Sequence, residues 1–309
     1  MLDNMQLIDT HTHTVYSGHG EGTPQDLVKV ALDKGLSTLA ITEHLPLPTQ
    51  LDPDGTFSML PAQVDEYTSE IDTARELVHH IDATPAANLE IICGVEVDWR
   101  QSAEEFILNQ LGLDNRGLGK SSTTSSGTTS AKPRYQLILG SVHMLTGENP
   151  LDPLDYWPLD YIGTIDGWYQ RGVRYVWEQY VRLWLDAVTS RVPFDIMSHP
   201  DLPKKLGFHP DFDASSLWMQ MADAAAAKGV MIEVNTSGLF YASKEVFPCP
   251  QLLEEFCRAG VPCTISSDAH SPANVNRAYA EGIKAMLDAG YQKVTIPTAD
   301  GDRREIPLV

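Results

Sequence analysis

The sequence predicts an α/β fold, a barrel of seven parallel strands that alternate with helices. Seven short segments rich in branched apolar residues recur along the 309 residues, separated by longer segments with helical periodicity. Histidines and acidic residues follow nearly every one of the apolar segments. In a parallel barrel, functional side chains gather at the C-terminal ends of the strands, whereas an open doubly wound sheet concentrates them at one switch point. Polar residues after so many successive strands therefore favour the closed barrel.

The order of the elements follows from apolar patterning and from helix boundary residues. The seven expected strands are residues 6–8, 37–42, 89–97, 135–142, 194–198, 230–234 and 262–266. The expected helices are residues 24–34, 61–81, 168–191, 214–228, 250–259 and 272–289. Several of these helices have a proline near the start and a glycine directly after the end, at Gly35, Gly229, Gly260 or Gly290.

Two further segments lie outside this alternation. Residues 112–134 are rich in Ser, Thr and Gly and contain almost no large apolar side chain, so we expect a flexible surface insertion between the third and fourth strands. A lid over the functional site is the alternative for this segment. Residues 294–309 predict a two-stranded hairpin around Asp300 and Gly301, packed outside the barrel. We expect residues 1–309 to form a single domain.

The composition limits the classes of partner. The formal net charge is −20 and the pI is about 4.7, which argues against nucleic acid because phosphate backbones are bound by Lys and Arg clusters. No apolar run approaches the length of a membrane span, and the N-terminal residues have neither the basic nor the apolar region of a signal peptide. The four cysteines lack C-x-x-C spacing. We therefore expect a cytoplasmic protein with free thiols and no membrane partner.

The segment DTHTHTVYSGHG (9–20), directly after the first expected strand, contains three histidines. His11 and His13 are two positions apart, so both leave an extended strand on the same face. Two neutral imidazoles that converge in this way are an ordinary start to a metal site. Taken alone, the H-x-H pair is equally compatible with a polar loop.

Later strands supply further candidate ligands. Seven of the ten histidines follow expected strands or lie in the first loop, and Glu96 and Asp268 lie near the ends of the third and seventh strands. Taken singly, each of these residues has a structural explanation as a helix cap, a core residue or an exposed strand residue. Together they exceed the roughly four ligands of one zinc ion and indicate two or three divalent ions, with Glu96 as a bridging carboxylate. A pair of such ions activates water for attack on phosphorus or on a carbonyl carbon. The remaining histidines are expected at the surface: His79, His80 and His209.

The order of these motifs resembles a known superfamily. H-x-H, His19, T-E-H, G-x-E, S-V-H, S-H-P-D and S-D-A-H, from Asp9 to about Pro272, are similar to the polymerase and histidinol phosphatase (PHP) superfamily. DTHTHTVYSGHG, SHPDLPKK and NTSGL resemble most closely its histidinol-phosphatase branch. The resemblance implies a distorted (β/α)7 barrel with three divalent metal ions, of zinc, iron or manganese, at the C-terminal ends of the strands.

The resemblance also assigns ligands and a reaction. It implies a first metal held by His11, His13, Glu96 and Asp268, a second held by Glu96, His143 and His199, and a third held by His19, His44 and His270. Asp268, His270 and Glu96 are the implied catalytic residues. The implied reaction is hydrolysis of a small phosphomonoester by metal-activated water, with L-histidinol phosphate of histidine biosynthesis as the leading substrate.

One position departs from the histidinol-phosphatase pattern. A basic residue that grips phosphate is expected just after N-T-S-G-L, but Phe240 and Tyr241 stand there. An arginine would offer a bidentate fork to phosphate. Its absence leaves hydrolysis of a phosphomonoester as the expectation and the identity of the alcohol open. The candidate substrate contacts are Lys204, Lys205, Lys244 and Asn235.

Other functions remain open at this point. The nearest alternative is a PHP-type phosphoesterase acting on another small phosphomonoester, a nucleotide or a phosphodiester, although the net charge disfavours long nucleic acids. An amidohydrolase would also begin with H-x-H, but it would normally require a metal-bridging lysine at a later strand end, and Glu96 occupies the comparable role here. A non-catalytic metal-binding PHP module is a further alternative, and the complete set of ligand positions argues against it. The sequence makes no prediction of the oligomeric state.

Overall fold

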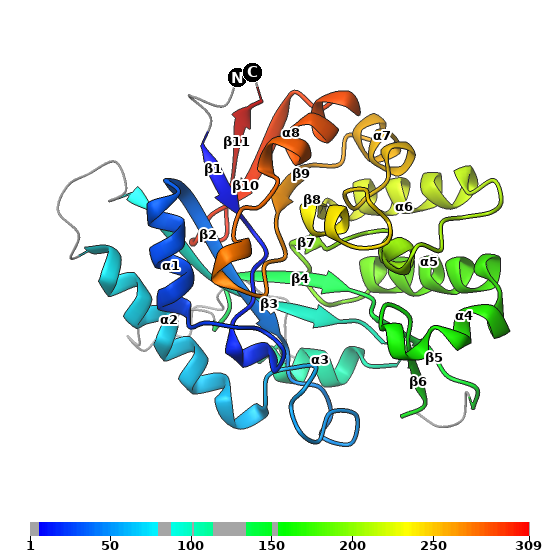
Figure 1. Ribbon diagram of the computed structural model, residues 1–309, viewed down its shortest axis with the longest axis horizontal. Helices are drawn as coiled ribbons and strands as arrows, with labels where there is room; N and C mark the ends of the chain where they lie inside the picture. The colour runs from blue at the N-terminus through cyan, green and yellow to red at the C-terminus, as the bar shows by residue number, and fades with distance from the viewer. Residues whose placement is uncertain (1–5, 80–87, 101, 114–133, 150–153, 309) are drawn as a thin grey trace, which may run out of the picture.

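The computed structural model describes residues 6–79, 88–100, 102–113, 134–149 and 154–308. Seven parallel strands form its central sheet and follow one another in chain order: β1 (Leu7–Asp9), β2 (Leu36–His44), β3 (Glu90–Asp98), β4 (Leu137–Ser141), β7 (Ile196–Met197), β8 (Met231–Asn235) and β9 (Cys263–Ser266). Each overlaps one of the seven predicted strands. The sheet curls into a barrel with helices around its outside (Figure 1). The predicted fold class is confirmed.

Contacts between the first and last strands nearly close the barrel. Thr12 and Ala269, just beyond β1 and β9, form an isolated parallel bridge, in which the amide of His13 donates to the carbonyl of Ala269 at 2.8 Å. The hydroxyl of Thr10 donates to the carbonyl of Ile265 at 3.1 Å. The loops after β1 and β9 therefore lie side by side at the C-terminal end of the barrel.

The helices cover the outer face of the sheet: α1 (Pro24–Asp33), α2 (Val64–His79), α3 (Glu104–Gln110), α4 (Asp166–Arg171), α5 (Val173–Thr189), α6 (Ser215–Lys228), α7 (Pro250–Arg258) and α8 (Tyr279–Asp288). The helix α1 begins with a capping box, in which Thr23 and Asp26 satisfy each other's backbone amides. The prediction of one helix over residues 168–191 is wrong, because Gly172, with φ 84°, separates α4 from α5. The predicted start of the last helix at residue 272 is also wrong, because Asn276 and Ala278 have positive φ and delay α8.

The two faces of the barrel strands carry different side chains. Outward residues pack with the helices in one large core, which includes the fully buried Trp177 and Trp184 of α5. Inward residues form a second, smaller apolar cluster: Ala40, Ile92, Leu137, Leu139, Ile196 and Met231. Because side chains alternate along a strand, residues an even number of positions later point the same way. His44, Glu96 and Asn235, each four positions beyond a member of this cluster, therefore lie on the inner face above an apolar floor.

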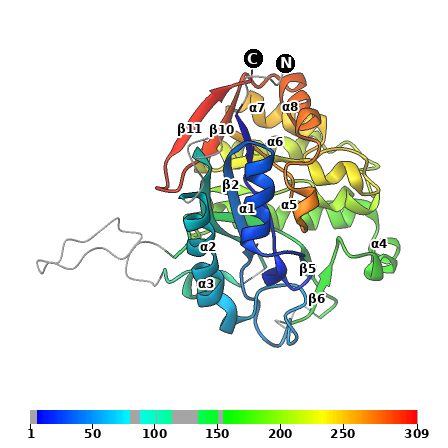
Figure 2. The ribbon, with the colours of Figure 1, turned by 60° about the vertical axis from the view of Figure 1, so that its left-hand side comes forward.

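Two hairpins are added to the barrel. The predicted C-terminal hairpin is present as the antiparallel pair β10 (Lys293–Pro297) and β11 (Arg303–Pro307). The guanidinium of Arg304 donates to Gln6 and Thr38, so the hairpin packs where β1 and β2 begin, away from the functional end of the barrel (Figure 2). A second hairpin, β5 (Met144–Thr146) and β6 (Tyr156–Pro158), was not predicted.

Three minor predictions have different outcomes. All four cysteines are free, as predicted. His209 is exposed, as predicted, while the side chain of His79, the whole of His80 and most of the 112–134 insertion lie outside the described residues. Within the described part of the chain, no helix is both long enough and apolar enough to cross a membrane.

Candidate metal centre

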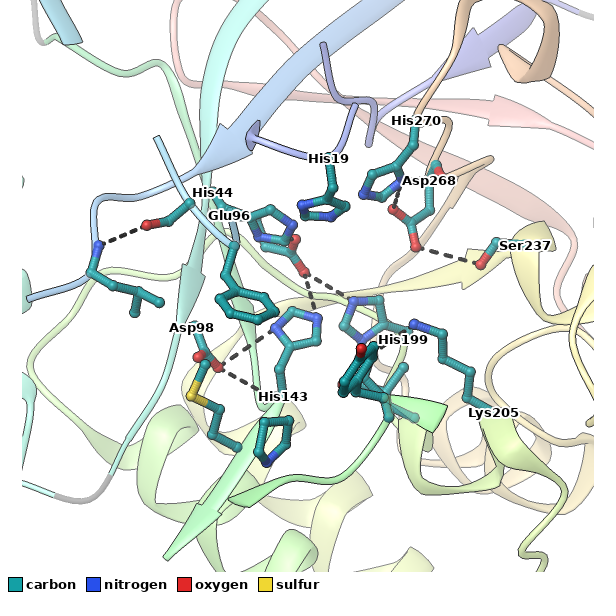
Figure 3. A pocket seen from close by; sticks show the side chains of 18 of the residues that line it. His19, His44, Glu96, Asp98, His143, His199, Lys205, Ser237, Asp268 and His270 are labelled. Carbon is teal, nitrogen blue, oxygen red and sulfur yellow. Dashed lines mark hydrogen bonds and ion pairs between the residues drawn. The ribbon is translucent and has the colours of Figure 1, made fainter. Parts of the chain in front are cut away.

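A cavity of about 440 Å³ opens at the C-terminal ends of the barrel strands (Figure 3). Strand ends and the loops that follow them supply its polar wall, which includes His19, His44, Glu96, Asp98, His143, Asp160, His199, Lys205, Ser237, Asp268 and His270. His11 and His13 are fully buried beside it. Seven candidate metal ligands thus line one cavity and two more lie directly behind its wall.

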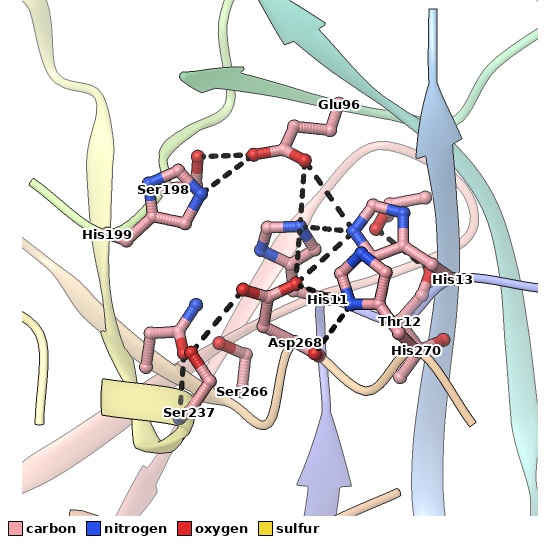
Figure 4. A network of polar contacts seen from close by, with 12 residues as sticks. His11, Thr12, His13, Glu96, Ser198, His199, Ser237, Ser266, Asp268 and His270 are labelled. Atoms are coloured by element: carbon pink, nitrogen blue, oxygen red, sulfur yellow. Dashed lines mark hydrogen bonds and ion pairs between the residues drawn. The ribbon is translucent and has the colours of Figure 1, made fainter. Parts of the chain in front are cut away.

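Glu96 connects two sides of the cluster, with His199 on one side and His11 and His13 on the other (Figure 4). It is 1% exposed, and its two oxygens lie 2.9–3.8 Å from ring nitrogens of five histidines: His11, His13, His44, His143 and His199. Burial opposes ionisation of this carboxyl, but the nearby His11, His44 and His143 outweigh burial and hold its pKa well below the usual range. Glu96 is therefore a carboxylate that faces several imidazoles at once.

The possible ligand atoms fall into three overlapping groups. Within each group the atoms lie within 4.8 Å of one another: His11, His13 and Asp268; His44, Glu96 and His143; and His13, His44 and His270. His19 stacks on His44 and His270, with ring centroids 5.3 and 4.8 Å apart. These groups and His19 comprise eight of the nine candidate ligands, and the ninth, His199, has Nε2 2.9 Å from Glu96 Oε1. The nine residues therefore form one cluster, which is larger than a single ion requires.

The state of the His13 imidazole fits a divalent cation. Burial, together with the nearby His270 and His44, lowers the pKa of His13 well below its usual value, so the ring is neutral and keeps a lone pair for a metal. Nδ1 of His199 is buried and has no hydrogen-bond partner. In the same ring, Nε2 lies 2.9 Å from Glu96 Oε1, so His199 presents this second nitrogen to the central carboxylate.

Glu233 is a buried acid that sequence reasoning did not select. Its two oxygens both lie 3.2 Å from His11 Nδ1, and it also accepts hydrogen bonds from the amide of His199 at 2.9 Å and from the hydroxyl of Ser266 at 2.7 Å. A carboxylate on Nδ1 fixes the His11 tautomer so that Nε2 faces the cluster. The available signal was its position in β8, two residues after the inward-facing Met231 and two before Asn235.

Glu43 orients His13 through a hydroxyl. Its carboxylate accepts hydrogen bonds from the amide and the hydroxyl of Thr14, at 2.8 and 2.7 Å, and from Ser17 Oγ. Because the one Ser17 proton is donated to Glu43, Ser17 Oγ accepts from His13 Nδ1 at 3.0 Å. The Nε2 lone pair of His13 is thereby directed at the cluster. Asp98 supports His143 at two points: it accepts a hydrogen bond from the backbone amide of His143 at 3.0 Å, and its Oδ1 lies 3.5 Å from His143 Nδ1.

Backbone conformation also directs two candidate ligands. His199 and Asp268 adopt φ values of 27° and 50°, in the left-handed region that non-glycine residues seldom occupy. Each stands two residues beyond the last residue of its strand, β7 or β9. The turn of the backbone at these points aims both side chains back over the barrel mouth, and such strain is typical of functional positions.

Of the four candidate substrate contacts, Lys205 lines the cavity, and Figure 3 shows its side chain extending toward the histidines. The side chain of Lys204 is 1% exposed and lies outside the cavity wall, with its Nζ 2.9 Å from Asp201 and 3.0 Å from Glu245. Lys244 is exposed and also lies outside that wall. Asn235 is buried below the cavity, where it donates to Glu233 at 2.9 Å.

Asp160, Tyr241 and the apolar residues of the cavity wall were not predicted. Lys205 Nζ lies 2.7 Å from an oxygen of Asp160 and 4.8 Å above the ring of Tyr241. Where the histidinol-phosphatase pattern has a basic residue, the half-exposed ring of Phe240 carries the guanidinium of Arg277, 4.4 Å from the ring centroid. The apolar part of the wall is formed by Leu45, Leu47, Phe57, Met144, Tyr161, Leu202 and Phe247.

Comparison with known families agrees with the motif order. The PHP domain model matches residues 9–237, more than half of the chain. The chain belongs to the PHP domain family. The region matched by the domain model ends at residue 237, before the S-D-A-H motif. Asp268 and His270 of this PHP protein are therefore assigned to the cluster by their geometry alone.

Similar proteins extend the comparison over almost the whole PHP chain. It is 29% identical over 289 residues to a "Probable histidinol-phosphatase" of Deinococcus radiodurans, covering 94% of this chain and 96% of the relative. It is 26% identical over 288 residues to the histidinol-phosphatase of Bacillus subtilis, covering 89% and 97% of the two chains. A histidinol phosphate phosphatase from Lactococcus lactis, solved in complex with zinc, L-histidinol and phosphate, superposes with a TM-score of 0.71 at 19% identity, covering 96% and 98%. The predicted family and the barrel fold are confirmed.

Proposed function

We propose that this PHP protein is a metal-dependent histidinol-phosphatase, which hydrolyses L-histidinol phosphate to L-histidinol and phosphate in histidine biosynthesis. The observation that carries the proposal is the convergence of seven imidazoles, Glu96 and Asp268 on one cavity at the C-terminal ends of the strands. The relatives named histidinol-phosphatase align with this chain over nearly their whole length. A phosphate dianion is suited to such a site because it can meet several cations at once.

The proposed cofactor is a set of three divalent ions of zinc, iron or manganese. His11, His13, Glu96 and Asp268 would hold the first ion, Glu96, His143 and His199 the second, and His19, His44 and His270 the third. When bound, these ions supply positive charge next to the phosphate oxygens and lower the pKa of water. Glu233, Glu43 and Asp98 orient the imidazoles that face the ions.

Exposure separates ligands that only hold a metal from those that can also meet the substrate. The side chains of His11 and His13 are 0% exposed, whereas those of Asp268 and His270 are 13% and 27% exposed and line the cavity. We therefore assign Asp268 and His270 to the catalytic group. We add the buried Glu96 for a different reason, because its two oxygens face several of the ligand imidazoles. Ser237 Oγ lies 3.4 Å from Asp268 Oδ2 and helps to fix that carboxylate.

We assign Lys205 as the residue that binds the phosphate group of the substrate. Its ammonium is a point charge that can contact phosphate oxygens from the cavity wall, although without the bidentate geometry of an arginine. The other three candidate contacts lie elsewhere. Lys204 is ion-paired outside the cavity wall, Lys244 lies in an exposed loop, and Asn235 supports Glu233. The apolar wall around Leu47 and Phe247 limits access of bulk water to the ester.

One observation favours a second candidate substrate class. Phe240 stands where a phosphate-binding basic residue is expected, so a small phosphomonoester with another alcohol is the alternative. The test is a comparison of kcat/KM for L-histidinol phosphate, nucleoside monophosphates and a generic phosphodiester, each assayed with zinc or manganese supplied. The proposal predicts the highest value for L-histidinol phosphate. A preference of more than about tenfold for a nucleotide or the diester, which is about 1.4 kcal/mol in transition-state binding, would reject it.

A further inference from the structure

An ion pair in the cavity wall has no part in the metal cluster. Lys205 lies in the short helix Leu202–Leu206 after β7, and Asp160 lies two residues after β6. Their charged atoms are 2.7 Å apart, and the two side chains are 22% and 14% exposed. Both residues line the cavity. Both charges can therefore be reached by a molecule bound there.

The backbone on both sides of this pair is held in place. The amide of Leu159 donates to the carbonyl of His143 at 3.0 Å, and the indole of Trp168 donates to the carbonyl of Leu159 at 2.8 Å. On the other side, the neighbouring Lys204 is tied to Asp201. The pair is preorganised, so little ordering entropy is lost when a ligand meets it.

Asp160 differs from the other acids of the cavity. Among the cavity-lining residues that the structure describes, Glu96, Asp98 and Asp268 each contact a histidine ring, whereas the ion pair of Asp160 is with a lysine. Asp160 is therefore a carboxylate available to the substrate once the lysine takes another partner.

The substrate of the proposed function has matching charges. L-Histidinol phosphate carries its ammonium on the carbon next to the CH2–O–phosphate group, so a cation and a dianion lie a few bonds apart. When a zwitterion of this kind meets a lysine–aspartate pair, the partners can exchange: phosphate pairs with the lysine and ammonium with the aspartate. No charge is then left unpaired in the cavity, which is the condition under which buried ion pairs are favourable.

We propose that Asp160 is the specificity-determining residue for the ammonium group, and that the Asp160–Lys205 pair selects phosphate esters of 2-amino alcohols. This inference rests on the proposed function and names the ammonium group as the part of the substrate that the Asp160 carboxylate recognises. An ester without the ammonium would draw Lys205 to its phosphate and leave Asp160 without a partner, so the same pair discriminates against simple alkyl phosphates.

The test compares two substrates on variants of the full-length, metal-loaded protein. The substrates are L-histidinol phosphate and its deamino analogue, 3-(imidazol-4-yl)propyl phosphate. Asp160→Asn is expected to lower kcat/KM for L-histidinol phosphate by at least about tenfold and for the deamino analogue by less than about threefold, because the amide cannot pair with an ammonium. Asp160→Glu, which keeps the charge, should retain the preference. Lys205→Met should lower both values.

The control is Asp288→Asn, which removes a carboxylate paired with Lys284 on the surface of α8; it should change neither value. Equal losses for both substrates in Asp160→Asn, with an unchanged melting temperature, would overturn the inference, as would no loss for either. If the wild type fails to hydrolyse L-histidinol phosphate, the proposed function fails. Phosphoethanolamine and ethyl phosphate then test the inference separately on the same variants, and equal kcat/KM ratios in wild type and Asp160→Asn would overturn it.

Discussion

At the scale of single residues, the candidate centre depends on how acids are distributed around imidazoles. Glu96 contacts the histidines directly, while Glu233 and Glu43 lie behind His11 and His13 and orient them. A glutamine at either kind of position keeps the shape but removes the charge. Loss of the charge at Glu96 and loss of the charge behind His11 or His13 should therefore affect metal binding in different ways.

Replacement of Glu96 by Gln should affect more than one metal. Because its oxygens face both His199 and His44, a bridging carboxylate is lost and the bound metal should fall by more than one equivalent per chain. His19→Ala, at the more exposed side of the cluster, serves as the comparison and should lose at most one. The measurement is elemental analysis of the purified variants after dialysis. An unchanged metal content in Glu96→Gln would contradict the bridging assignment.

Replacement of Glu233 by Gln should weaken metal binding without removing a ligand. The amide no longer fixes the His11 tautomer, and loss of such a partner lowers metal affinity by roughly 10- to 100-fold. Competition with a chromophoric chelator measures this affinity directly. If Glu233→Gln binds metal as tightly as the wild type, the positioning role is wrong.

Sequence reasoning could locate the candidate ligands but not their supports or the substrate wall. His44, Glu96 and His143 stand at or near strand ends, a place that an apolar run followed by a polar residue indicates. Asp160 was not selected, because its approach to Lys205 depends on the short hairpin β5–β6, whose three-residue strands give no periodic signal. Lys204 and Lys205 are adjacent in sequence, and nothing in the sequence tells which one faces the cavity.

At the scale of elements, the periodic segments were predicted well and the breaks between them were not. The apolar strands and helices such as α6 follow their patterns closely. The division at Gly172 and the late start of α8 depend on single backbone conformations, which a periodic pattern cannot reveal. Boundaries set by one φ angle need tertiary context.

We propose that the insertion at residues 112–134 is dispensable for folding. It joins α3 to β4, and both of these elements pack through their own buried residues, such as Ile107 and Leu139. Replacing residues 114–133 with a short Gly-Ser linker should leave the melting temperature within about 2 °C, since surface loops cost little to change. Limited proteolysis should cut the native chain in this segment first. Unfolding of the shortened protein would show that the segment is structural, and a raised KM with normal stability would support a lid.

At the scale of the whole molecule, the metal centre joins strands from all around the barrel. His11, His44, Glu96, His199 and Asp268 come from five different strand ends. A ligand set of this kind links the first and last strands of the sheet, whose ends come together at the Thr12–Ala269 bridge and at neighbouring contacts. Bound metal should therefore contribute to the stability of the barrel as a whole.

Removal of metal is expected to lower the melting temperature by several degrees. A ligand that binds only the folded state stabilises it by about 4 kcal/mol at a thousandfold excess over its dissociation constant. Calorimetry of chelated and zinc-reconstituted protein measures the difference, and readdition of zinc after removal of the chelator is the control. Identical melting temperatures would mean that the ligand cluster binds no metal with useful affinity.

The central claim is that these clustered side chains form the metal centre of a histidinol-phosphatase. The most direct measurement is phosphate release from L-histidinol phosphate by metal-free protein titrated with zinc or manganese. The account predicts no turnover without metal and activity that rises until more than one equivalent is bound per chain. Full activity of the metal-free protein, or no hydrolysis of L-histidinol phosphate at saturating metal, would contradict it.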